Sequence, residues 1–145
     1  MSLIGCCIFR WGPDVEAKVR FLRPGFVVVA DTCWNDLPAI IAACPKDIII
    51  ILRNMADNLI EWTIPNVVSP MLAVVHQYPD SQFVGYGLNE NHSPFTERAA
   101  EWEWAFIERC HDYGLKTICL NGAYGNDPDN RFKEVASASD YVGWH

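Results

Sequence analysis

The chain has 145 residues, half of them apolar, and its formal net charge is −7. This size and apolar content allow it to bury a core of its own, which excludes a disordered protein. The acidic charge argues against binding to nucleic acid or to an anionic membrane surface, because both need a basic face. It fits a neutral or cationic ligand. No apolar run approaches the ~20 residues of a membrane span.

The N-terminal segment 1–9 is apolar but short, and it has neither a preceding basic stretch nor a small-residue cleavage site. We therefore expect no signal peptide. The six cysteines lie in or beside apolar segments, and they form no C-x-x-C pair. Both observations predict a cytoplasmic chain with buried, reduced thiols.

Six apolar runs of strand length follow one another along the chain. They cover residues 3–9, 26–30, 47–53, 83–89, 116–121 and 141–145. The runs are nearly continuous rather than alternating, which is typical of strands that are buried on both faces in a parallel sheet.

Helical signals lie between these runs. Pro13 opens the first predicted helix, and Asn35 or Asp36 can cap the second. Ser69-Pro70 and Ser93-Pro94 share one form, a capping hydroxyl followed by proline at the first helical position. The segment 54–68 is predicted to be a long loop over a site, because it precedes the Ser69 signal and contains Trp62.

The predicted helix after Ser93 carries apolar residues at helical spacing, and Gly114 supplies its C-terminal stop. The stripe consists of Ala99, Trp102, Phe106, Cys110 and Tyr113. Trp104 falls among glutamates on the opposite side and is predicted to be exposed. A last short helix is marked by Phe132, Val135 and Ala136.

The alternation of strands and helices predicts an α/β fold in a single domain over residues 1–145, with right-handed crossovers.

Two architectures are compatible with this order of strands and helices. The length suits an open doubly wound sheet, since a closed (β/α)₈ barrel needs about 250 residues. The loops favour a barrel. The turn after the first strand has only one glycine, Gly12, and polar residues gather at the strand ends, where a barrel brings them to one mouth. We predict a partial barrel of about six strands, in sequential order, that stops before closure.

The strongest local signal is the segment 85–92, which ends in Asn89, Glu90, Asn91 and His92 and closes the fourth predicted strand. Asn89-Glu90 in this position resembles the acid/base motif of the large clan of retaining glycoside hydrolases with (β/α)₈ barrels. The resemblance implies that Glu90 is the general acid/base and that Asn89 binds a sugar hydroxyl. A general acid at neutral pH needs a raised pKa, which burial in an aromatic-lined mouth supplies.

The last strand also resembles the sixth strand of that clan, where a residue such as His145 faces the substrate. The clan's nucleophile is a second glutamate at the end of strand seven, which has no counterpart before His145. The two carboxyls of a retaining enzyme lie about 5 Å apart. Asp31, at the end of the second strand, is the nearest candidate by topology. The 145-residue chain is therefore expected to have little or no hydrolytic activity.

Further substrate contacts are predicted from residues at strand ends and in loops. Arg53 can hold a carboxylate or a sugar hydroxyl, and Asn121 ends the fifth strand. Trp34 and Tyr124 can stack on sugar faces, as can Trp11 and Trp62, although core packing is an equal alternative for these aromatic residues. No motif for a cofactor is present, and the histidines show no paired metal-ligand spacing.

Three functions remain open on sequence grounds. The first is glycoside hydrolysis by a complete barrel, with a second copy or a second chain supplying the missing strands. The second is a non-catalytic module on the same fold that binds carbohydrate or a protein. The third is a small open-sheet domain of unknown role. Two open sheet edges predict association, either as a homo-oligomer or with a completing partner.

Overall fold

A computed structural model describes residues 5–89, 96–122 and 132–144, although not the side chains of residues 120–122, 132, 143 and 144. The strands are β1 (Gly5–Ile8), β2 (Phe26–Ala30), β3 (Ile49–Arg53), β4 (Gln82–Tyr86), β5 (Lys116–Gly122) and β6 (Tyr141–Trp144). The helices are α1 (Pro13–Leu22), α2 (Leu37–Ala43), α3 (Ile64–Gln77), α4 (Glu97–His111) and α5 (Phe132–Ala138). Two short 3-10 helices, η1 (Asp31–Asp36) and η2 (Leu59–Glu61), follow β2 and β3.

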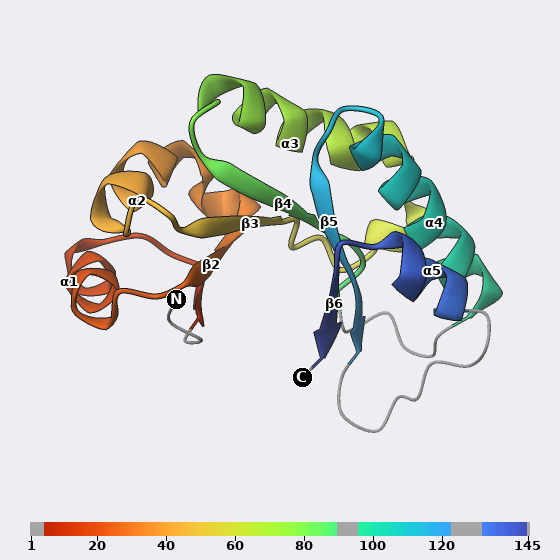
Figure 1. Cartoon of the computed structure of the whole chain (residues 1–145), viewed down its shortest axis with the longest axis horizontal. Coiled ribbons are helices and arrows are strands. Elements are labelled where there is room, and N and C mark those ends of the chain that lie inside the picture. The colour runs from red at the N-terminus through yellow and green to blue at the C-terminus, as the bar shows by residue number, and fades with distance from the viewer. Residues whose placement is uncertain (1–4, 90–95, 123–131, 145) are drawn as a thin grey trace.

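The described strands form one parallel sheet in the order β1-β2-β3-β4-β5-β6. The sheet curls into an arc, and α1 to α5 cover its outer, convex side (Figure 1). The sequential order lacks the reversal that defines a doubly wound sheet. The predicted (β/α) repeat with the curvature of a partial barrel is therefore confirmed.

The isoleucine run of β3 shows why these strands carry apolar residues at every position. Ile50 is fully buried in the cluster under the helices, whereas Ile51 belongs to a second cluster on the concave face. The strand register places Val28 beside Ile51 and Ile51 beside Val84. These three residues form one layer of the kind that fills the interior of a (β/α)₈ barrel.

The start of α3 differs from the prediction. The helix begins at Ile64 with Pro65 in its first turn, so Pro70 lies inside it and the connection after β3 is shorter than expected. Pro70 cannot donate to the carbonyl four residues earlier, which disfavours a helix interior. Burial of the apolar face outweighs that local cost, because Val67, Met71 and other residues of α3 are buried.

The α4 stripe is confirmed in its central part. Ala99, Trp102, Phe106 and Cys110 are buried, and Trp104 is 39% exposed as predicted. Tyr113 is half-exposed instead of buried, because α4 ends at His111. Gly114 follows in the left-handed region at φ 70°, and its N–H donates to the His111 carbonyl at 2.9 Å, which confirms the predicted stop. Ser93 and Pro94 lie outside the described residues, and α4 begins at Glu97 with Thr96 as its N-cap.

All six cysteines are free, as predicted, but only Cys33, Cys110 and Cys119 are buried. Cys6 and Cys44 are partly buried and Cys7 is exposed, which differs from the prediction. None of the helices in the described part of the chain combines the length and apolar character that crossing a membrane requires.

Candidate functional site

The carboxyl-terminal ends of β3 and β4 carry a buried polar cluster. Arg53 is the last residue of β3 and is only 5% exposed. It lies two residues beyond Ile51, so its side chain shares the concave face with the Val28–Ile51–Val84 layer, one layer nearer the strand ends. Such a position corresponds to the mouth of a (β/α)₈ barrel, where ligand-binding residues are found.

The guanidinium of Arg53 is held by neighbours from β4 and from the segment that follows it. Its Nε donates a hydrogen bond to Oδ1 of Asn89 at 2.8 Å. Its central carbon lies 4.8 Å from the centroid of the Tyr86 ring, which adds a cation–π contact. Burial of a cation costs free energy unless such partners compensate for lost water. These contacts therefore fix the guanidinium plane at the mouth.

Asn89 links the end of β4 to the segment after β3. Its Nδ2 donates to the carbonyl of Asn54 at 3.0 Å and to that of Ala56 at 3.4 Å. The side chain of Asn54 accepts from the Ala56 N–H at 2.9 Å, which closes the turn. The carbonyl oxygen and the amino group of the Asn89 side chain both bind within the chain. Its described role is to position Arg53 and this turn.

A carboxylate that the sequence analysis did not single out supports the same segment from the helix side. Glu103 of α4 is 2% exposed, and its Oε1 accepts the Leu88 N–H at 3.0 Å. A Cβ at Gly87 would lie 2.5 Å from Glu103 Oε2, so the close approach requires glycine. The available signal was Glu103 at helical spacing within the apolar stripe of α4, four residues after Ala99.

Several predicted site residues lie outside the described residues. These are Glu90, Tyr124 and His145. Asn121 belongs to β5, and its side chain is not described. The expected grouping of Glu90 with Asn89, Asn121 and His145 therefore stays a prediction.

Asp31 and Trp34 follow the end of β2 in η1. The Asp31 side chain accepts the N–H of its neighbour Thr32 at 2.9 Å, a local turn contact. Trp34 donates from Nε1 to the Val29 carbonyl at 3.2 Å and packs against the cluster under the helices. The structure thus brings together Arg53 and Asn89 from the predicted set, and Trp34 lies on the helix side.

The chemistry available at this cluster is hydrogen-bond donation by a fixed cation. A guanidinium offers a planar fork of donors that suits hydroxyl and carboxylate oxygens. Across the described ranges, no three side chains of His, Cys, Asp or Glu gather as a metal site would require. No protein-family model matches this chain, and no curated protein matches it.

Proposed function

We propose that the mouth formed by the strand ends binds carbohydrate, and that it is the active site of a glycoside hydrolase-like barrel in which Glu90 is the general acid/base. The supporting observation is the buried hydrogen bond between Arg53 and Asn89. It joins the ends of two adjacent parallel strands, and the residue bonded to Asn89 on its carboxyl side is Glu90. Glycoside cleavage uses a carboxyl group as general acid, and Asn89, the neighbour of Glu90 in the sequence, is held in place by this hydrogen bond.

A second candidate is a non-catalytic carbohydrate-binding module on the same fold. The observation that favours it is that the Asn89 amino group donates to the carbonyls of Asn54 and Ala56 and its Oδ1 accepts from Arg53, so both ends of the side chain already bind within the chain. An asparagine that contacts a sugar hydroxyl needs a donor or acceptor directed at the ligand. In this candidate Arg53 and loop aromatics bind the sugar, and no bond is cleaved.

The pKa of Glu90 distinguishes the two candidates. Burial raises the pKa of a carboxyl group, whereas a nearby guanidinium lowers it. The catalytic proposal requires burial to outweigh Arg53, so we expect an NMR titration to place the Glu90 pKa above its free value of about 4.3. A value at or below 4.3 would leave the binding module as the better candidate.

The activity test uses the 145-residue chain with activated aryl glycosides, together with the Glu90→Gln variant. We expect weak carbohydrate binding with little or no turnover. Retaining hydrolysis needs a second carboxyl about 5 Å from the first, and no motif in this sequence supplies one. Proton donation alone contributes about 10²–10⁴-fold. Robust turnover that Glu90→Gln abolishes would show that another residue, with Asp31 the first candidate, provides the second carboxylate.

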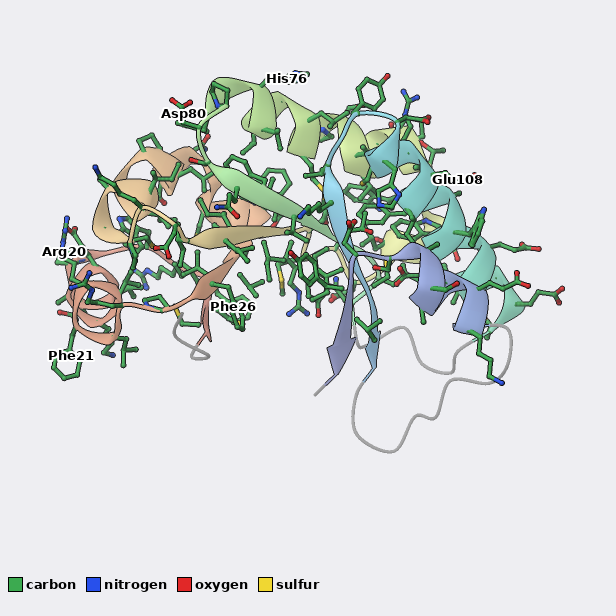
Figure 2. The ribbon with its side chains drawn as sticks, in the orientation of Figure 1. Arg20, Phe21, Phe26, His76, Asp80 and Glu108 are labelled. Atoms are coloured by element: carbon green, nitrogen blue, oxygen red, sulfur yellow. The ribbon has the colours of Figure 1, made fainter. Side chains whose placement is uncertain are left out.

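The binding test compares Arg53→Lys with Arg20→Lys by calorimetric titration with neutral oligosaccharides. Lysine keeps the charge but loses the planar fork, so Arg53→Lys is expected to weaken binding about fivefold or more. Arg20 lies on α1 and points away from the sheet (Figure 2). It pairs with Glu16 at the surface, so its replacement should leave affinity unchanged. Equal affinity in both variants would contradict a site at Arg53.

A further inference from the structure

A shallow groove lies at the start of α3, outside the mouth. It has a volume of about 550 Å³ and is lined by Glu61, Trp62, Thr63, Pro65, Asn66, Ser69 and Pro70. We call it the rim groove. The segment that carries it connects β3 to α3, so the rim groove lies at the end of the sheet where Arg53 and Asn89 also lie.

Trp62 is held in the rim groove by its own contacts. Its Nε1 donates to Oδ1 of Asn58 at 3.2 Å, and its carbonyl accepts from Nε1 of Trp102 at 3.1 Å. The side chain nevertheless stays 37% exposed. An indole that is already fixed loses little rotational freedom when a ligand binds to it. Trp62 is therefore a rigid apolar platform at the surface.

The polar groups beside Trp62 favour an uncharged ligand rich in hydroxyls. Thr63, Asn66 and Ser69 are exposed and offer two hydroxyls and one amide. Thr63 makes no capping hydrogen bond to α3, so its hydroxyl is not used by the helix. Glu61 is paired with Arg98 at 2.7 Å, and the described residues of the lining include no lysine or arginine. A polyanion would find no cation in the lining to bind.

From this chemistry we infer that the rim groove binds a neutral oligosaccharide, with one sugar ring stacked on Trp62. The apolar face of a pyranose matches an indole, and its hydroxyls match the flanking hydroxyl and amide groups. Proline-rich peptides are the competing ligand class, but they dock in grooves lined by several aromatic residues. The rim groove has one. The inference needs no hydrolysis at the mouth and does not depend on Arg53.

The test follows the indole N–H resonance of Trp62 in the whole chain during titration with neutral glucose and xylose hexasaccharides. Trp62→Phe identifies this resonance by its loss. We expect saturable shifts at Trp62, and we expect Trp62→Ala to weaken calorimetric binding tenfold or more. Trp62→Phe keeps an aromatic face and should retain most of the affinity. Melting curves of each variant separate loss of the groove from loss of folding.

Trp104→Ala is the matched control. Trp104 is exposed to nearly the same extent, 39% against 37%, and it also lines a hollow, of about 390 Å³. That hollow is bounded by Ala100, Glu101, Glu134 and Val135, and none of these described residues offers a hydroxyl or amide side chain. Trp104→Ala should therefore leave oligosaccharide binding unchanged.

Two results would overturn the inference. One is equal oligosaccharide affinity in wild type and Trp62→Ala, and the other is a Trp62 response to a proline-rich peptide but not to sugars. Persistence of the Trp62 shifts in Arg53→Lys would show that the rim groove binds independently. Shifts at Trp62 without any effect of Arg53→Lys on affinity would support the rim groove and contradict the site at the mouth.

Discussion

At the scale of single residues, the candidate site depends on a few buried polar groups that fix one another. Arg53 is oriented by Asn89 and Tyr86, and the backbone just before Asn89 is held by Glu103. Each of these residues is nearly inaccessible to solvent. In a buried network, removing one residue leaves the polar groups that it bound buried without a hydrogen-bond partner. Their desolvation is then uncompensated, so single substitutions should lower the free energy of unfolding by a large amount.

Gly87→Ala tests this network directly. The added methyl group would lie 2.5 Å from Glu103 Oε2 and 2.9 Å from Oε1, and the buried carboxylate has little room to move. We expect the free energy of unfolding, measured with denaturant, to fall by about 1–3 kcal/mol. Gly12→Ala is the control, because a Cβ there meets no atom within 4 Å and its backbone is extended.

Gly87→Ala in a Glu103→Ala background should lower the free energy of unfolding less than it does in the wild type, because the effects of substitutions at residues in contact are not additive. Equal costs in the two backgrounds would show that the overlap with Glu103 is not the cause.

At the scale of elements, the helices differ in how their ends are secured. Thr96 caps α4 by accepting the Ala99 N–H on its hydroxyl at 3.2 Å, whereas Thr63 at the start of α3 makes no such bond. The end of α4 is tied to the residue just before β6 through His111, whose Nε2 lies 2.9 Å from Oδ2 of Asp140. These contacts hold α4, and with it Glu103, against the sheet.

Thr96→Ala is expected to lower the free energy of unfolding by about 1 kcal/mol, because it removes a side-chain cap. Thr63→Ala should cost less than about 0.5 kcal/mol, since that hydroxyl makes no capping bond. Chemical denaturation of both variants gives the comparison. A cost for Thr63→Ala as large as that for Thr96→Ala would contradict this assignment of the caps.

Asp140 makes the attachment of β6 dependent on pH. Burial raises the pKa of Asp140, but hydrogen bonds from the Thr117 N–H and from His111, together with the charges of His111 and Lys116, outweigh burial and lower it. A carboxyl whose pKa is lowered by folding stabilises the protein above its unfolded pKa of about 3.9, and this stability is lost as the pH falls through the folded pKa.

We therefore expect Asp140→Asn to melt about 2–4 °C below the wild type at pH 5–6, and the difference to shrink as the pH falls below about 4. Asp80→Asn, at an exposed turn that points away from the sheet (Figure 2), should show no difference at any of these pH values. A melting difference for Asp140→Asn that is constant down to pH 2 would mean that its charge is not responsible.

At the scale of the whole molecule, the concave face of the arc is apolar and partly open. Phe26, Tyr141 and Val142 are 36%, 40% and 51% exposed there, around a hollow of about 220 Å³ that Ile51 and Val84 also line. Figure 2 shows Phe26 on the concave side of the ribbon, opposite the outward-pointing His76 and Glu108. Among the described strands, β1 pairs only with β2 and β6 only with β5.

Open edges and exposed apolar surface favour association. We predict that the 145-residue chain self-associates or binds a second chain over this face. Val142→Lys should shift the population toward monomer in sedimentation velocity experiments, because it places a charge in the contact. Glu108→Lys, on the outer face of α4, should leave it unchanged. A stable wild-type monomer at high concentration would contradict self-association over this face.

The sequence by itself determined the repeating architecture. Apolar runs without alternation predicted strands buried on both faces, and their alternation with helices predicted the sequential parallel order, because each right-handed crossover places the next strand beside the last. The motif at Asn89 and the prediction of Arg53 at a strand end also came from sequence alone. The local signal failed at α3, where Ser69-Pro70 predicted the start but the helix begins at Ile64 with Pro65 in its first turn.

Only the tertiary structure decided which polar residues meet. The contact of Arg53 with Asn89 joins residues 36 positions apart, and its geometry depends on strand register and curvature. Glu103 lies on a helix whose polar residues were expected at the surface. Its burial is possible because Gly87 has no side chain and leaves space for the carboxylate. The hydrogen bonds that occupy Asn89, and the fixed indole of Trp62, likewise arise from packing between segments. No local pattern specifies such contacts, because each depends on where the rest of the chain lies.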